Sequence, residues 1–583
     1  LTQIETGIAP YDVKLLGNKA YVTNWGGRRP KPGELTGPTS GSQALITPAG
    51  IASSGTVTVI DLDARQAVKE IEVGLHASGM AFSPKGDRLY VANANSDTVS
   101  VIDTARNEVV ATWLARPMKD LPFGSAPNAL AVSADGKTLY AALGGNNCIA
   151  VMDTGDGRVR GLVPTDWYPG AVLLQGDTLI SANVKGIGSL NQDREQMARQ
   201  LSEHFKRVVQ PGNYFNSRYA LGSVSFIPVP DGKALEQYTF EVAENMRLPF
   251  MHETLGLAPV AAKTVPVPRR PGETSVFKHV FYIIKENRTY DQVFGDLPQG
   301  NGDPTLCFFP REVTPNLHAL AEQFVLLDNF YCNGVCSADG HQWAVEGFVT
   351  DYLEKSFGDF PRSYPYDGDD ALAYASSGFI WDHILAKGYT IRNYGEMVKA
   401  MINPPKSSWA EIYKQYKDGT SEIKIQARSA VKGLDDYTCK DFIGFPGTMQ
   451  DVYRADIFLK EFRTFEQNGQ LPNFVVMLLP NDHTAGTRPG MPTPRAAVAD
   501  NDLAVGRIVE AISKSKYWAD SVIFIVEDDP QAGLDHVDGH RTTALCISPY
   551  TKRAAVDSTH YNQSSMLRTM ELIFGLAPMN QFT

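Results

Sequence analysis

The stretch "HVFYIIKENRTYDQVFGD", residues 279–296, decides the fold of the second half of the chain. Its apolar run has the length of a core strand and passes directly into the polar residues Lys285 to Arg288. Strand-like apolar runs and stretches of helical spacing then alternate along the chain. The apolar runs are 279–285, 473–479, 521–526 and 543–548, and the helical stretches include 451–469 and 501–515. This alternation predicts a mainly parallel sheet with helices on both faces.

Polar donors follow the strands of this predicted sheet. In such sheets, ligands bind outside the carboxyl ends of the strands. Four segments are therefore candidates for a binding site. They are Glu286 and Asn287 after the first run, "VCSADGHQWAVEG" at 335–347, "FVVMLLPNDHTAG" at 474–486, and "VEDDPQAGLDHVDGHR" at 526–541. Each alone is more often a helix cap, a turn or a solvated loop. Together they predict a metal site, because adjacent carboxylates such as Asp528 and Asp529 repel one another unless a cation or proton intervenes.

The first third of the chain repeats a different pattern. The segment "GDRLYVANANSDTVSVIDTARNEVVATW", residues 86–113, reads as three short strands joined by turns, and related segments occur at 17–27, 55–73, 136–163 and 176–186. Asp61, Asp103 and Asp153 end equivalent strands, 42 and then 50 residues apart. A period of about 40 to 50 residues with several strands per unit is typical of β-propeller blades. A β-sandwich with regular turns is the alternative.

"YVTN" at 21–24 and "YVAN" at 90–93 resemble the YVTN family of β-propellers. We expect a propeller over residues 1–263 with four or five recognisable blades. This is fewer than the seven that the resemblance implies, so blades are missing upstream or degenerate. Residues 191–210 have helical spacing and predict a helical insertion that projects onto a neighbour or merely caps the propeller. The prolines of 264–277 predict a linker.

The composition and charge of the chain argue against several classes of protein. The 583 residues carry a formal charge of -11, with 43% apolar and 20% charged residues. No basic run is present, which argues against a nucleic-acid partner, because such proteins hold phosphates with lysine and arginine. No apolar stretch approaches the roughly 20 residues that span a bilayer. Six scattered cysteines without a CxxC pair favour buried free thiols over disulfides.

The polar motifs resemble those of one enzyme family. "ENRTYDQVFGD" at 286–296, "LPNDH" at 479–483 and "DDPQAGLDHV" at 528–537 are similar to motifs of the phosphoesterase family that contains bacterial phospholipases C and related acid phosphatases, a branch of the alkaline phosphatase superfamily. The resemblance implies a multidomain β and α/β protein. The propeller would precede an alkaline-phosphatase-like α/β/α sandwich over residues 278–583.

Carried over to this sequence, the resemblance implies roles for individual residues. Ser337 would be the nucleophile, and His341 and His483 are the other catalytic candidates. Pro530 stands where the family has a histidine, so we expect His536 or His540 to replace it. The full metal-ligand prediction is Glu286, Asn287, Asp482, Asp528, Asp529, His536 and His540. The predicted substrate-binding residues are Asn287, Arg288 and His483.

These residues suit hydrolysis of a small-molecule phosphate ester through a phosphoserine. A divalent cation offsets phosphoryl charge and activates the serine, and a helix beginning near Gly340 would add positive potential beside Ser337. The mixed donors favour zinc, with calcium, iron, manganese or magnesium as alternatives. A phosphomonoesterase is the leading hypothesis. The others are a phosphodiesterase or phospholipase C, and a surface binding protein with an inactive phosphatase domain.

Two expectations concern the surroundings of the protein. The propeller is expected to cover the metal site or to bind an unknown surface partner, such as a glycan or a protein. The resemblance implies a periplasmic, secreted or cell-surface location in a bacterium.

Overall fold

The structure, a computed structural model, describes residues 2–189, 214–251, 264–358, 360–531 and 533–583. The helix predicted at 191–210 lies outside these residues. Among the described residues, none of the helices combines the length and the apolar character needed to cross a bilayer. All six cysteines are free thiols.

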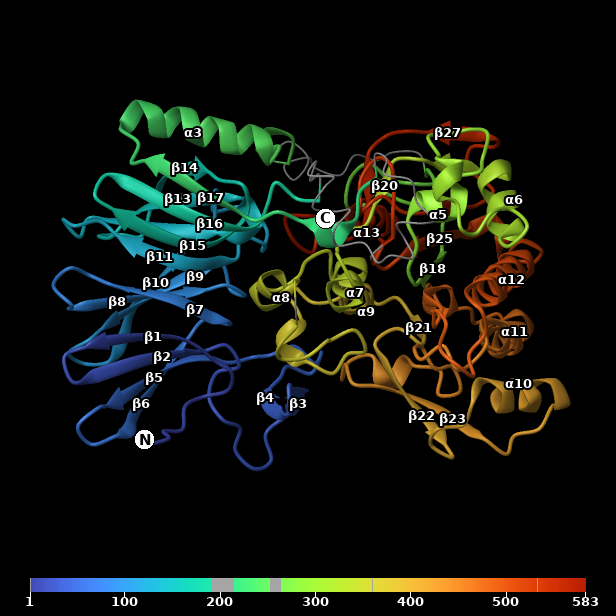
Figure 1. Cartoon of the computed structure of the whole chain (residues 1–583), viewed down its shortest axis with the longest axis horizontal. Coiled ribbons are helices and arrows are strands. Elements are labelled where there is room, and N and C mark those ends of the chain that lie inside the picture. The colour runs from blue at the N-terminus through green and yellow to red at the C-terminus, as the bar shows by residue number, and fades with distance from the viewer. Residues whose placement is uncertain (1, 190–213, 252–263, 359, 532) are drawn as a thin grey trace.

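The first half of the chain forms successive antiparallel sheets, which lie side by side in Figure 1. The first contains β1 (Pro10–Leu16), β2 (Lys19–Asn24), β5 (Gly55–Asp61) and β6 (Gln66–Val73), with the hairpin β3 (Thr36–Thr39) and β4 (Ser42–Leu45) as an excursion. The second contains β7 (Ala77–Phe82), β8 (Arg88–Asn93), β9 (Thr98–Asp103) and β10 (Glu108–Leu114). The third contains β11 (Pro127–Val132), β12 (Thr138–Leu143), β13 (Cys148–Asp153) and β14 (Val159–Pro164). Three strands, β15 (Trp167–Gln175), β16 (Thr178–Gly186) and β17 (Ser223–Pro228), form the fourth, and α3 (Gly232–Asn245) packs on β14.

The repeated aspartates form the same turn in each sheet. Asp61, Asp103 and Asp153 end β5, β9 and β13. The Oδ1 atom of each accepts a hydrogen bond from the backbone amide two residues later, at 2.9, 3.1 and 2.8 Å. Such a bond closes a tight turn after the strand. The repeat in the sequence is therefore a repeat of turn chemistry.

The repeated asparagines join neighbouring strands. Asn24, Asn93 and Asn183 are buried, and the side-chain amide of each donates to two hydroxyl groups on the next strand of its sheet. First strands of successive sheets also contact one another, β1 with β7, β7 with β11, and β11 with β15. Four related sheets thus follow one another as the repeats predict. Their closure into a propeller remains a prediction.

The second half contains the predicted α/β sheet. Its strand order is β21-β24-β18-β25-β26, from β21 (Ile391–Tyr394), β24 (Phe474–Leu479), β18 (His279–Lys285), β25 (Ser521–Glu527) and β26 (Ala544–Ile547). The first four strands are parallel, and β26 is antiparallel to β25. Short pairs accompany the sheet: β19 (Val325–Leu327) with β27 (Ala555–Asp557), β20 (Phe330–Tyr331) with β28 (Tyr561–Asn562), and β22 (Val398–Asn403) with β23 (Lys424–Ser429).

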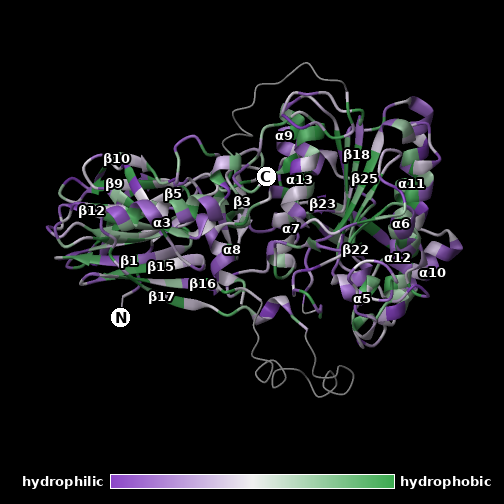
Figure 2. Ribbon diagram, turned by 90° about the horizontal axis from the view of Figure 1, so that it is seen from above, coloured by the Kyte–Doolittle hydropathy of each residue, from purple (hydrophilic) through white to green (hydrophobic). Residues whose placement is uncertain are grey.

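Helices cover both faces of this sheet (Figure 2). Alternate residues of β18 belong to two different cores, Val280, Tyr282 and Ile284 to one and Phe281 and Ile283 to the other. The first core includes α7 (Ser337–Glu346), α8 (Asp351–Ser356), α9 (Ile380–Ala386) and α13 (Gln563–Ile573). The second includes α5 (Tyr290–Phe294), α6 (Pro315–Gln323), α11 (Asp451–Asn468) and α12 (Pro494–Ser513), while α10 (Trp409–Asp418) packs outside both. The period of two along the strand thus produces a helix–sheet–helix sandwich.

The two halves share a polar interface around α8. Asp351 accepts a hydrogen bond from the Tyr168 hydroxyl at 2.9 Å and pairs with Lys355 at 3.0 Å. Beside it, Lys185 Nζ lies 2.7 Å from Glu354 Oε2, and both side chains are about 5% exposed or less. The predicted linker contains no helix or strand among its described residues, only an isolated bridge between Val265 and Ser275. These charged side chains, together with apolar contacts such as Trp25 with Tyr352 and Phe123 with Phe348, therefore hold the halves together in addition to the linker.

The buried pair at this interface can be tested with Glu354→Gln. The substitution leaves the Lys185 ammonium buried without its carboxylate, so we expect the free energy of unfolding to fall by about 3 to 5 kcal/mol. Urea unfolding followed by circular dichroism measures the change. The matched control is Asp418→Asn, which breaks an exposed pair with Lys414 and should change stability by less than about 1 kcal/mol. Equal effects of the two substitutions would contradict this account of the interface.

Candidate active site

The carboxyl ends of three neighbouring strands bring acidic residues together. Glu286 follows β18, Asp482 follows β24 and Asp528 follows β25, and all three are buried. The ammonium group of Lys285 joins these ends, since it lies 2.8 Å from Asp482 and 2.7 Å from Glu527. Burial alone would lower the pKa of Lys285, but these two carboxylates raise it above its usual value. The lysine therefore carries a charge that stabilises the strand ends.

At the same edge, the negative charge of a second group of acidic residues is offset less completely. His341 Nε2 lies 3.3 Å from Glu286 Oε1 and 3.5 Å from Asp528 Oδ2, and the three ligand atoms lie within 4.8 Å of one another. Glu286 Oε1, His341 Nε2 and both Asp528 carboxylate oxygens are buried, and no described residue forms a hydrogen bond to them. Burial, together with Asp529 and Glu286, raises the pKa of Asp528 well above its usual value. The donors fit a divalent cation, since an unpaired buried carboxylate is costly and mixed oxygen and nitrogen ligands suit transition metals.

Glu396 holds the imidazole in place. Its Oε1 atom lies 3.1 Å from His341 Nδ1. Burial would lower the pKa of His341, but Glu396 and Glu286 raise it well above its usual value. A metal-binding histidine commonly donates its other ring nitrogen to a carboxylate, which fixes the ring and its tautomer. Glu396 has the position for this role.

Ser337 lies beside these residues. Its hydroxyl donates a hydrogen bond of 2.9 Å to Asp529 Oδ2. Burial raises the pKa of Asp529 to about 6. The helix α7 begins at Ser337 itself, and the predicted start near Gly340 was three residues late. The early start follows from Asp339, whose carboxylate accepts hydrogen bonds from the amides of Val335 and Cys336 and so caps the helix.

A glycine allows α7 to approach the strand ends. A Cβ atom at Gly340 would lie 2.7 Å from the carbonyl oxygen of Asp528 and 3.1 Å from the Asp529 Cβ. Both are shorter than an ordinary van der Waals contact. The helix that carries Ser337 and His341 therefore packs directly on the backbone that carries the two aspartates.

Three other predicted residues have local roles. The Asn287 amide donates to the Gln531 side chain. The Arg288 guanidinium donates to the backbone oxygens of Asp482 and His483, at 2.8 and 2.9 Å. Arg288 therefore stabilises the loop that follows β24. His483 is half-buried, and its Nδ1 lies 2.8 Å from the oxygen of Thr484.

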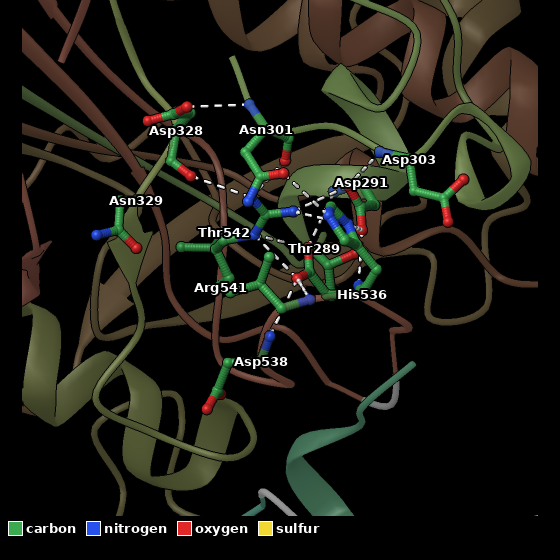
Figure 3. Close-up of polar contacts among 12 residues, drawn as sticks. Thr289, Asp291, Asn301, Asp303, Asp328, Asn329, His536, Asp538, Arg541 and Thr542 are labelled. Carbon is green, nitrogen blue, oxygen red and sulfur yellow. Dashed lines mark hydrogen bonds and ion pairs between the residues drawn. The ribbon is translucent and has the colours of Figure 1, made fainter. Parts of the chain in front are cut away.

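His536 and His540 do not join the Asp528 group. His536 Nδ1 lies 2.7 Å from Asp291 Oδ2, and its Nε2 lies 3.2 Å from Asn301 Oδ1 (Figure 3). His540 Nδ1 lies 3.1 Å from the Ser189 hydroxyl and 3.2 Å from Asp538. The predicted replacement of the family histidine by either residue is thus not what the structure shows. His341, predicted beside the nucleophile, provides the imidazole among the acidic residues.

The cluster around Asp291 already contains its own cation. Asp291, Asp535 and His536 lie close enough to hold a metal. However, the Arg541 guanidinium donates to Asp291 at 2.9 Å (Figure 3) and to Asp535 at 2.9 and 3.1 Å. Its remaining nitrogen donates to the carbonyl oxygens of Asn301 and Asp328. The guanidinium thus offsets part of the charge of the two carboxylates, and His536 also contacts Asp291. This cluster therefore anchors the 528–541 loop to α5.

Three features were not predicted from the sequence. They are the contact of Glu396 with His341, the position of Lys285 between two strand ends, and the ion pairs of Arg541. Glu396 follows β21, so it obeys the same rule as the other acidic residues at strand ends. The run Ile391–Tyr394 is only four residues long and contains an arginine and an asparagine, which hid the strand. Lys285 carried a signal, because a charged residue that ends a buried strand needs a partner.

The close approach at Gly340 can be tested with Gly340→Ala. The added methyl group meets backbone, so α7 must shift, and we expect the free energy of unfolding to fall by about 1 to 3 kcal/mol. Chemical denaturation measures it. Gly232→Ala is the matched control, since nothing lies within 4 Å of its added Cβ. A Gly340→Ala protein as stable as the control would show that the helix does not pack as described.

Comparison with known proteins gives one family match, which includes part of this site. Residues 299–577 match the model of the Phosphoesterase family. The match includes Ser337, His341, Asp528 and Asp529 and begins after Glu286. No curated protein matches the chain.

Two solved structures are similar to parts of the chain. A protein of the alkaline phosphatase superfamily from Vibrio parahaemolyticus shares 17% identity over 57% of this chain and 76% of its own, with a TM-score of 0.35. Hydrazine synthase of Kuenenia stuttgartiensis shares 30% identity over 25% of this chain, with a TM-score of 0.21, and the chain spans 42% of that protein's length. Neither similarity is close enough to define the fold. The family match supports the assignment of residues 299–577 as a phosphoesterase domain, a phosphoric ester hydrolase.

Proposed function

We propose that this protein is a metal-dependent phosphomonoesterase that acts through a phosphoserine on Ser337. One observation carries the proposal. The Ser337 hydroxyl, which is hydrogen-bonded to Asp529, lies beside the buried Glu286–His341–Asp528 group. The ligand atoms of that group have no hydrogen-bond partner among the described residues. Glu286, His341 and Asp528 would hold a divalent cation, with Asp529 and Ser337 next to it. When bound, the cation supplies positive charge that stabilises the phosphoryl oxygens and lowers the pKa of a nearby hydroxyl.

The remaining chemistry belongs to the chain itself. Asp529 Oδ2 accepts the Ser337 proton as the serine oxygen forms a bond to phosphorus and the bond to the leaving alcohol oxygen breaks. The positive end of α7 lies at Ser337 and favours the phosphate there. Water then attacks the phosphoserine and loses a proton to His483, which gave one to the leaving alcohol in the first step. The serine oxygen leaves and takes its proton back from Asp529.

His483 is the candidate that exchanges a proton with the leaving oxygen. Its Nδ1 faces a carbonyl oxygen, which requires a proton on Nδ1 and leaves Nε2 as the nitrogen that exchanges one. We retain zinc as the first choice of metal, because the donor set combines carboxylates with an imidazole.

The nucleophile is tested with Ser337→Ala. We expect turnover of 4-nitrophenyl phosphate to fall about a thousandfold or more, while the metal content stays at the wild-type level. Release of nitrophenol measures turnover, and bis(4-nitrophenyl) phosphate tests the diesterase alternative with the same readout. Ser513→Ala, at the end of α12, is the control. Full activity in the Ser337 variant would exclude this serine as nucleophile.

The metal is tested by elemental analysis of protein purified without chelator. We expect a bound divalent ion, zinc first, and a reduced ion content in Glu286→Gln and Asp528→Asn, because each removes a charged ligand. Asp538→Asn is the matched control, since its carboxylate faces His540 and not the site. The same ion content in all four proteins would place the metal elsewhere, and no ion in any would oppose metal dependence.

A further inference from the structure

A pocket lies next to the nucleophile. It has a volume of about 310 Å³ and is lined by Arg218, Cys336, Phe357, Gly358, Phe360 and Tyr364. Cys336 directly precedes Ser337 and is the N-cap residue of α7. The pocket therefore reaches the start of the helix that carries the serine.

Most of the pocket comes from the phosphoesterase domain, but Arg218 comes from the first half of the chain. Its backbone position is fixed by the two residues that precede it. The Ser217 hydroxyl donates a hydrogen bond of 3.3 Å to the carbonyl oxygen of Val335, two residues before the nucleophile. The Asn216 side chain caps the short turn by accepting the Arg218 amide at 2.9 Å.

The same segment pairs with the loop that follows the aspartates. Phe215 and Asp535 exchange two backbone hydrogen bonds, at 2.7 and 3.2 Å. A Cβ atom at Gly539 would lie 2.3 Å from the Ser217 amide, so the two backbones are in direct contact. The segment 214–219 is thus built into the wall of the site.

Arg218 brings an unpaired charge to this wall. Within the described part of the chain, no carboxylate pairs with its guanidinium and no acceptor bonds to it, and the side chain is exposed. Lys185 nearby differs, because Glu354 already neutralises it. A free guanidinium beside aromatic rings suits an anionic group attached to an apolar body, since arginine binds carboxylate or phosphate oxygens in a forked geometry.

We propose that this pocket is the subsite for the alcohol part of the substrate, with Arg218 binding an acidic group on that alcohol and Phe357, Phe360 and Tyr364 contacting its apolar part. The inference rests on the proposed function, because it places the leaving group next to Ser337. It defines the substrate class as phosphomonoesters whose alcohol carries a second negative charge. Arg218 is then a specificity-determining residue contributed by the β-sheet half of the chain.

The test compares two substrates in the full-length, metal-loaded protein. 4-Carboxyphenyl phosphate carries the second charge and 4-methylphenyl phosphate lacks it. We expect Arg218→Gln to lower kcat/KM about fivefold for the first, the effect of an exposed ion pair of about 1 kcal/mol, and to leave the second unchanged. Arg218→Lys keeps the charge but loses the forked geometry, so its kcat/KM for the first substrate should fall less than that of Arg218→Gln. Because each variant is compared with wild type on the same substrate, the different reactivity of the two esters cancels.

One control variant and the activity of the wild type separate the outcomes. Arg463→Gln removes another exposed arginine, on α11, and should leave both kcat/KM values unchanged. If Arg218→Gln affects both substrates equally, or neither, the subsite inference is overturned while hydrolysis by the wild type still supports the proposed function. If the wild type hydrolyses neither ester, the proposed function and the subsite fall together.

Discussion

The structure depends on how buried carboxylates are neutralised at one edge of the α/β sheet. Three acidic groups illustrate this. Lys285 lies between Asp482 and Glu527, and Arg541 lies between Asp291 and Asp535, so both groups contain their own cation. Around Asp528, by contrast, buried ligand atoms lack hydrogen-bond partners among the described residues. Because burial of an uncompensated charge costs several kcal/mol, and His341 is the one basic group that contacts both Glu286 and Asp528 among the described residues, this third group is the one where we propose that a cation binds.

The Lys285 and Arg541 groups fix the backbone on both sides of the Asp528 group. Lys285 ties the ends of β24 and β25 to β18, which fixes the backbone from which Glu286 and Asp528 extend. Arg541 ties the far end of the 528–541 loop to α5, so that the loop cannot relax away from its own acidic start. These ion pairs keep Glu286 and Asp528 close together although their like charges repel. The free energy that offsets this repulsion therefore comes from folded structure outside the Asp528 group.

The sequence predicted this edge well because strand periodicity and topology decide it. Glu286, Asp482, Asp528 and the Ser337 turn converge for the reason expected, as parallel strands end together. His536 and His540 were misplaced because closeness in sequence to Asp528 says nothing about the direction of a loop, and that direction is set by Arg541. The start of α7 was misjudged because its cap depends on Asp339 reaching back to two amides. Such contacts have a geometry that no residue spacing specifies.

The halves of the chain are not independent modules joined by a linker. Residues 214–219 pair with the loop that begins at Asp528, and α8 carries Asp351 and Glu354 into the β-sheet half. Removal of the first half would leave the Asp535 and Val335 backbones without these partners and would expose the side chains of α8. Unpaired buried backbone groups are costly. The segment 214–219 from the first half of the chain therefore contributes to the stability of the 528–541 loop, and the same contacts place Arg218 at the pocket beside α7.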